Sequence, residues 1–122
     1  MKNIEIASIV RTYHSGKSEM KLPAAVAWKR RMNMAKLIEA NAIIEEALQD
    51  VSKQYADDEH SIEKDGQRTV KPEYMAEFAK AQAEILDQDT EVDIRKVKIE
   101  DIGDIEVTDA DMDTIAFMIM EE

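Results

Sequence analysis

Few residues of this 122-residue chain are of types that could do chemistry. His14 and His60 are its two histidines, and neither has a second histidine at a metal-ligating spacing. His60 follows acidic residues 57–59, a group that we interpret as a solvated loop. Ser15 follows His14, but adjacency along the chain does not give a nucleophile the geometry of its base. The sequence therefore predicts a protein without enzymatic activity.

A calcium-like pattern near the C-terminus also has a simpler explanation. Asp109, Asp111 and Asp113 alternate like the start of a calcium loop. Thr114 and Met120 stand where that loop needs a Gly and a bidentate Glu. The carboxylates lie at the expected start of a helix, whose positive end favours them. The chain has no cysteine and no glycine-rich phosphate loop, so we expect neither a metal nor a cofactor.

The element that must organise the chain is a long helix, predicted from Pro23 to Tyr55. It contains no Gly, and its one Pro opens the first turn, where a missing N–H costs nothing. Such a helix is about 50 Å long. A compact chain of this length is only about 35 Å across. We therefore expect something outside the globule, most simply a second copy, to cover the excess.

Apolar residues at steps of three and four define a seam along this helix. We assign it to self-association, as the oligomer seam Met34, Leu37, Asn41, Ile44, Leu48, Val51 and Tyr55. Asn41 either fixes the register of a coiled coil or faces water or a nearby backbone group. A second row widens the stripe over the first half of the helix and favours packing into a core: Ala24, Trp28, Ala35, Ile38 and Ala42.

The remaining segments predict an α+β fold in one domain, residues 1–122. The long helix lies antiparallel to a shorter helix, with a β-hairpin at the tip, a small antiparallel sheet and a C-terminal helix. In chain order the segments are an N-terminal strand and short helix (1–22), the long helix (23–55), the hairpin tip (56–71), the second helix (72–87), and strands with the C-terminal helix (88–122).

Local patterns place the strands and turns within these segments. The strands are predicted at Lys2–Ile6, at Glu91–Ile99 with a bulge, and at Ile105–Val107. Asp65-Gly66 is a favoured hairpin turn, with Ile62 and Val70 as the residues to bury. Gly16 is expected to end the short helix, and Thr108 to cap the last one. The apolar stripe of that last helix is Met112, Ile115, Ala116 and Ile119.

The net charge of −11 is distributed unevenly. Residues 1–55 carry a net charge of +3, residues 56–122 carry −14, and residues 100–122 contain no base. This acidic part is either a solvated surface or a face that docks on a basic partner. The candidate partner-binding face is Glu100, Asp101, Asp104, Glu106, Asp109, Asp111 and Asp113. Its carboxylates repel phosphate, so this half should not bind DNA.

The sequence also contains one basic cluster, Lys29-Arg30-Arg31, with Lys36 and Trp28 close by. Contact with nucleic acid is one interpretation. We favour pairing with the acidic C-terminal third, within the chain or between subunits. No apolar run reaches 18 residues, and no signal segment is evident, so we expect a soluble protein with no membrane partner.

The chain resembles a loose family of small, uncharacterised proteins of tailed phages and prophages of Gram-positive bacteria. The resemblance rests on the Ile-rich N-terminal segment, Lys21-Leu22-Pro23-Ala24, Asn33 and Leu37, the acidic loop, Phe78, the segment Glu91–Ile99, and the ending Ile115-Ala116-Phe117-Met118-Ile119. It implies a phage accessory or host-interaction protein, made in the cytoplasm of the bacterial host. It implies no catalytic residue, and the Lys29-Arg30-Arg31 run departs from the pattern.

Three functions remain open at this point. The first is a non-enzymatic structural or accessory protein that self-associates through its long helix, most simply as a dimer. The second is an acidic mimic of nucleic acid that inhibits a basic host protein, such as an immune protein. The third is a small-molecule sponge with a pocket between subunits.

Overall fold

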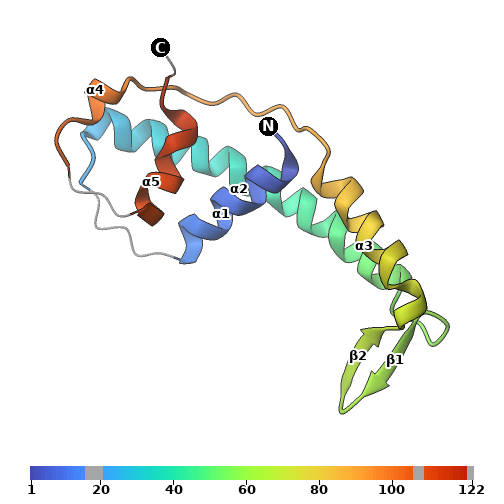
Figure 1. Cartoon of the computed structure of the whole chain (residues 1–122). Coiled ribbons are helices and arrows are strands. Elements are labelled where there is room, and N and C mark those ends of the chain that lie inside the picture. The colour runs from blue at the N-terminus through green and yellow to red at the C-terminus, as the bar shows by residue number, and fades with distance from the viewer. Residues whose placement is uncertain (16–20, 106–108, 121–122) are drawn as a thin grey trace.

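A computed structural model describes residues 1–15, 21–105 and 109–120. The fold is α+β, as the sequence predicts, with one long helix and one two-stranded antiparallel sheet (Figure 1). The elements in chain order are α1 (Asn3–Ser15), α2 (Ala24–Gln54), β1 (Ser61–Lys64), β2 (Gln67–Val70), α3 (Pro72–Leu86), α4 (Ile99–Ile102), α5 (Asp109–Ile115) and the 3-10 turn η1 (Ala116–Met118).

The long helix is present and unbroken. Pro23 stands just before α2 and Tyr55 just after it, within one residue of the predicted ends. Its 31 residues make a rod of about 46 Å. The chain covers this rod with two shorter helices laid along it, α1 beside its middle and α3 beside its C-terminal half (Figure 1). Helices of the chain itself therefore cover the length of α2 for which the sequence predicted a second copy.

The reason for this coverage is the N-terminal segment, which is helical where a strand was predicted at Lys2–Ile6. Ile4 and Ile6 do not share a face, because Ile6 is fully buried while Ile4 is 54% exposed. Ile6 and Val10, four residues apart, pack on Met34 and Leu37 of α2. A two-residue alternation is too short to outweigh this helical spacing. The helix ends at Ser15, and the predicted stop at Gly16 lies outside the described residues.

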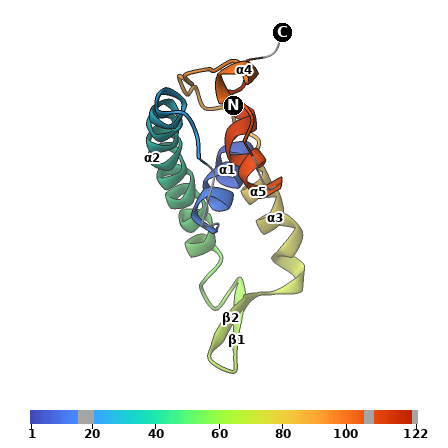
Figure 2. The same ribbon diagram turned by 90° about the vertical axis from the view of Figure 1, so that its left-hand side faces the viewer.

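The start of α1 is fastened to the end of α3, which links the two helices that cover α2. The Asn3 side chain donates to the Ile85 carbonyl at 2.8 Å and accepts from the Thr90 hydroxyl at 2.6 Å. The Asn3 backbone N–H donates to the Gln88 carbonyl at 2.9 Å. The Asn3 side chain thereby bonds the Ile85 carbonyl, one of those that a helix C-terminus leaves without an intrahelical partner. Figure 2 shows α1 lying between α2 and α5.

The predicted hairpin is confirmed, and it projects from the end of the helical body (Figure 1). Asp65 and Gly66 both have positive φ, 53° and 78°, as a two-residue turn of this kind requires. The apolar residues behave differently from the prediction, because Ile62 is 55% exposed and Ser61 is the buried residue of β1. The Ser61 hydroxyl is held by the Asp57 carbonyl and by Arg68.

The predicted strand Glu91–Ile99 is instead an extended strap, residues 88–98, followed by the short helix α4. Side chains of α2 supply the hydrogen bonds that a neighbouring strand would have made. The Asn33 amide accepts from the Arg95 N–H at 2.8 Å and donates to the Arg95 carbonyl at 2.9 Å. Lys36 donates to the Asp93 carbonyl at 2.8 Å. In the described part of the chain the strap therefore follows α2 without a partner strand, save two isolated bridges, Asp89 with Lys2 and Val97 with Ile119.

A second apolar cluster closes the chain around the start of α2. It joins Val26 with Val97, Ile102, Ile115 and Met118, all buried. The final helix changes to a 3-10 turn at Ala116, so Met118 is buried while Ala116 and Met112 are exposed. The predicted stripe of Met112, Ile115, Ala116 and Ile119 was therefore only partly correct. The predicted strand at 105–107 and the Thr108 cap fall largely on residues outside the described ranges.

The same substitution at two buried asparagines on α2 should change the free energy of unfolding differently. Asn33→Leu leaves the Arg95 N–H and carbonyl without partners, so we expect a loss of about 2–4 kcal/mol of unfolding free energy. Asn41 is 8% exposed, and its side-chain oxygen has no partner within the described part of the chain. Asn41→Leu removes that unsatisfied atom and should be neutral or stabilising by up to about 1 kcal/mol. Urea unfolding measures both, and equal losses would contradict the assignment.

Candidate functional site

The predicted oligomer seam faces the chain's own helices. Met34, Leu37 and Ile44 are at most 4% exposed and form one cluster with Ile6 and Val10. The rest of the seam is also covered: Asn41 and Val51 are buried, and Leu48 and Tyr55 are half-buried. Association of copies through these seven residues stays a prediction, but α2 does not need a second copy to shield them.

The side of α2 that stays uncovered is the second apolar row and its neighbours. We define the free flank as five residues spaced by four, three, four and four: Trp28, Met32, Ala35, Glu39 and Ile43. These steps place the five side chains on one face of α2. All of them are exposed except Met32, which is half-buried. Trp28 is 51% exposed and Ile43 is 65% exposed. The prediction that the second row packs into a core was wrong for Ala24, Trp28, Ala35 and Ala42.

One end of the free flank is cationic. The Arg95 guanidinium lies 4.9 Å from the centre of the Trp28 ring, a cation–π distance. The backbone of Arg95 is fixed at this position, because the Asn33 amide bonds both its N–H and its carbonyl. Arg31 lies one turn beyond Trp28 on α2 and is exposed. Neither arginine makes an ion pair with a described residue. Arg31 stands three residues after Trp28, a spacing that makes the two residues neighbours on one helix face.

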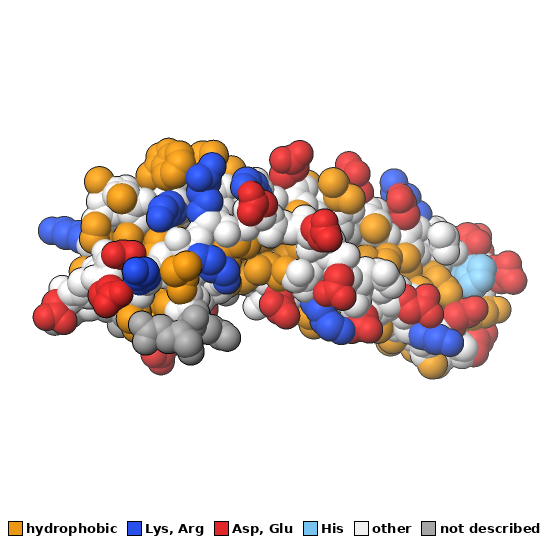
Figure 3. Space-filling model, turned by 90° about the horizontal axis from the view of Figure 1, so that it is seen from above, with side chains coloured by type: hydrophobic (Ala, Val, Ile, Leu, Met, Phe, Trp, Pro, Cys, Tyr) orange, Lys and Arg blue, Asp and Glu red, His pale blue; other side chains and the backbone are white. Residues whose placement is uncertain are grey.

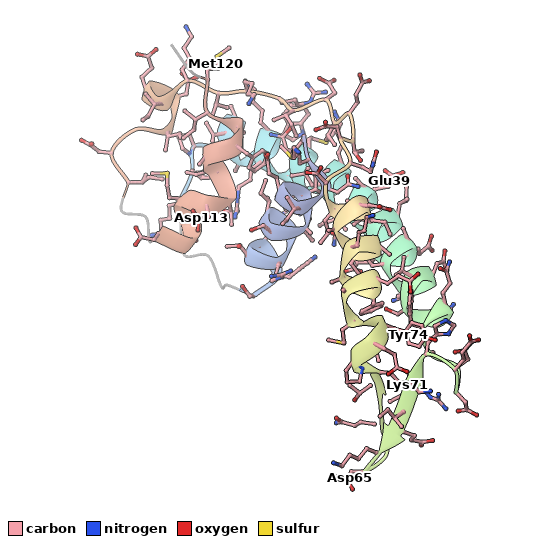
Figure 4. All side chains as sticks on the ribbon, turned by 45° about the vertical axis from the view of Figure 1, so that its right-hand side comes forward. Glu39, Asp65, Lys71, Tyr74, Asp113 and Met120 are labelled. Atoms are coloured by element: carbon pink, nitrogen blue, oxygen red, sulfur yellow. The ribbon has the colours of Figure 1, made fainter. Side chains whose placement is uncertain are left out.

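The other end of the free flank is an apolar hollow with an acidic rim. The hollow has a volume of about 360 Å³ and lies where α2, the end of α3 and the strap meet. Its apolar lining is Ile43, Ile44, Ala40, Ala47, Ile85 and Val92. Exposed carboxylates of Glu39, Glu91 and Asp93 line it with Lys36, giving these four groups a net charge of −2. Figure 4 shows Glu39 near the point where α3 gives way to the strap.

Most side chains of the predicted basic cluster bond to groups of the same chain. Lys36 contacts the Asp93 carbonyl and, at 3.8 Å, its carboxylate. Arg30 donates to the Thr114 hydroxyl at 2.9 Å and lies over the Tyr13 ring. Lys29 reaches the Lys96 carbonyl at 3.5 Å. The preference for pairing within the chain is therefore supported, although the partners are mainly carbonyl and hydroxyl groups. Arg31 is the exception.

The predicted acidic face is divided between two elements. Glu100 and Asp101 lie in α4, followed by Asp104, while Asp109, Asp111 and Asp113 lie in α5; Glu106 lies outside the described residues. Asp101 accepts from the Lys98 N–H and so caps α4. Figure 4 shows Asp113 on α5, well away from Met120. Docking of a basic partner on these carboxylates stays a prediction.

Charge is also unevenly placed over the surface as a whole. Figure 3 shows Lys and Arg gathered over the half of the molecule that carries the start of α2, while Asp and Glu prevail toward the hairpin. The strap runs from the acidic half to the basic half, because Glu91 and Asp93 precede Arg95, Lys96 and Lys98 along it. The two ends of the free flank therefore have opposite charge.

His60 belongs to an aromatic cluster that joins the hairpin to the helices. Its ring lies 5.3 Å from that of Tyr55 and 4.6 Å from that of Tyr74, and Tyr55 also meets Phe78 edge-on. Tyr74 lies at the junction of α3 and the hairpin, far from Asp65 at the tip (Figure 4). His60 Nδ1 lies 2.6 Å from an Asp57 carboxylate oxygen. Sequence reasoning missed this cluster because its members are spread over three elements.

The same loop holds the one group of potential metal ligands that the described residues contain. Ligand atoms of Asp57, Glu59 and His60 lie within 4.8 Å of one another. The two carboxylate residues are exposed, and the Asp57–His60 hydrogen bond already accounts for the closest pair. His14 and Ser15 stand at the end of α1, where Ser15 donates to the Thr12 carbonyl. Within the described ranges, these contacts give no nucleophile–base pair.

The stability of the hairpin junction should depend on pH through the ionisation of Asp57. The hydrogen bond from His60, its largest influence, holds the pKa of Asp57 below its ordinary value of 3.8. A lowered pKa means that the carboxylate stabilises the fold fully above its ordinary pKa and loses this effect as the pH falls through the lowered value. We expect the amide signals of β1 and β2 to shift in acid with the titration of Asp57. NMR between about pH 6 and pH 2 measures this, and an unchanged midpoint in Asp57→Asn would contradict it.

The chain was compared with protein-family models, with curated proteins and with solved structures, and none of these comparisons gave a match. None of the described helices is long and apolar enough to cross a membrane. Along the free flank, exposed apolar residues of α2 lie beside charges of both signs from α2 and the strap.

Proposed function

We propose that this chain is a non-enzymatic structural or interaction protein that acts as a dimer of identical chains. The supporting observation is the free flank, where Trp28 and Ile43 remain half exposed or more on a helix whose opposite side is buried or half-buried. Large exposed apolar side chains in line are typical of an interaction surface. The resemblance to small proteins of tailed phages and prophages supports a role as an accessory protein in the bacterial cytoplasm.

The sequence predicts self-association through a different set of residues, the oligomer seam of α2. That seam is covered by α1 and α3, so the contact between copies lies on the opposite side of the same helix. The free flank offers what a stable contact between copies requires: an aromatic anchor, an apolar hollow and a small residue between them, Ala35. The long helix is still the element through which copies meet.

Substitutions at two neighbouring isoleucines of α2 distinguish an effect on assembly from an effect on folding. Ile43→Asp places a charge on the free flank, so we expect a folded monomer whose circular dichroism matches that of the parent chain. Ile44→Asp buries a charge in the core, where Ile44 is 4% exposed, and should unfold the protein. Ala76→Asp, on an exposed site of α3, should change neither property.

Size-exclusion chromatography with light scattering provides the measurement. The parent chain at tens of micromolar should have twice the mass of one chain, and Ile43→Asp should have the mass of one chain. A parent chain that stays monomeric at these concentrations would refute the proposed function. A small molecule found in the hollow by native mass spectrometry, with no dimer, would favour a ligand-binding role instead.

A further inference from the structure

The proposed dimer leaves open how the two copies meet, and the two ends of the free flank differ in a way that decides it. One end is a protruding indole with guanidinium groups beside it, and the other is an apolar hollow with carboxylates around it. We propose that Trp28 of each copy inserts into the hollow beside Ile43 of the other, in an antiparallel two-fold dimer. This inference rests on the proposed function and adds the geometry of the partner.

Shape supports the pairing of these two ends. Trp28 lies 51% exposed at one end, and tryptophan is among the side chains enriched as anchors in the pockets of interfaces. The hollow, of about 360 Å³, has a size typical of sites that enclose a ligand side chain or a small molecule. Its lining is largely apolar, with Ile43, Ile85 and Val92 among its residues.

Charge supports the same pairing and excludes a parallel one. Each copy carries a net charge of −11, so two copies repel unless cations of one meet carboxylates of the other. An antiparallel contact places Arg31 and Arg95 of one copy against the rim carboxylates Glu39 and Glu91 of the other. A parallel contact places arginines on arginines at one end and carboxylates on carboxylates at the other. Juxtaposed like charges of this kind destabilise an interface.

Symmetry and distance are consistent with this arrangement. Trp28 and Ile43 are 15 residues apart, about 22 Å along α2. A two-fold axis that exchanges them passes midway, beside Ala35. Ala35 is small and exposed, so two α2 helices can approach closely at the axis. The contact is isologous: each copy contributes one Trp28 and one hollow, and the dimer closes without leaving either end open for further copies.

Complementary charge-reversal variants provide the test. The first variant, Arg31→Glu with Arg95→Glu, makes the Trp28 end acidic. The second, Glu39→Lys with Glu91→Lys, makes the rim of the hollow basic. Each variant alone should dimerise roughly 10- to 100-fold more weakly than the parent chain, since both of its contacts oppose like charges. Mixed in equal amounts they should form a heterodimer, because each Trp28 end then meets a hollow of opposite charge.

Trp28 reports directly on its own environment because it is the only tryptophan of the chain. Its fluorescence should shift to shorter wavelength as the concentration rises through the dissociation constant. The matched change Trp28→Phe should retain a weakened dimer, and Trp28→Glu should abolish it. A parent dimer whose Trp28 emission does not change with concentration, or whose charge variants do not rescue each other, would refute this geometry and leave the proposed function standing. A parent chain that never dimerises would refute both.

Discussion

The hydrogen bonds between the Asn33 amide and the backbone of Arg95 connect the fold of this protein to its candidate function. Asn33 is fully buried on α2, and it pairs with both the N–H and the carbonyl of one strap residue, as a neighbouring strand would. The strap can therefore lie along α2 as extended chain without exposing unsatisfied backbone to the interior. Both ends of the free flank depend on this, because the strap supplies Arg95 at one end and Glu91, Val92 and Asp93 at the other.

Coverage of α2 is divided among three parts of the chain. α1 packs beside the middle of the helix, α3 beside its C-terminal half, and the strap with α4 and α5 around its start. Asn3 links the first two of these parts by bonding to the end of α3. The result is an elongated molecule in which α1 and α3 lie along α2 (Figure 1). Trp28, Ala35 and Ile43, on another side of α2, remain exposed. An open side on a long helix is the condition for association between copies.

The sequence predicted those elements whose signals are local. The long helix has no break in 31 residues, the second helix begins at a proline, and Asp65-Gly66 defines the hairpin turn. The strands predicted at Lys2–Ile6 and Glu91–Ile99 are absent, because each run of apolar alternation was only two residues long. Ile4 and Ile6 lie in a helix, and Val92 and Ile94 lie in a strap whose hydrogen bonds come from Asn33 and Lys36, more than 50 residues earlier in the chain. No local pattern carries that information.

The candidate site, like the strap, depends on contacts between elements that are distant in the sequence. The spacing of Trp28 and Ile43 on one helix face could be read from the sequence, but two apolar rows compete for the core, and only the placement of α1 decides between them. Once α1 is recognised as a helix, the seam is covered and the other row becomes the surface. The hollow could not be predicted, because its lining comes from α2, α3 and the strap together.

A single engineered cysteine tests the central claim most directly, since the chain contains no cysteine of its own. Ala35→Cys places one thiol beside the proposed two-fold axis, and a disulfide forms only when two Cα atoms come within about 7 Å. Mild oxidation should convert this variant to a covalent dimer in high yield, while Ala76→Cys on α3 should remain a monomer. Equal cross-linking of both variants, or none at Ala35→Cys, would contradict an antiparallel dimer formed through the free flank of α2.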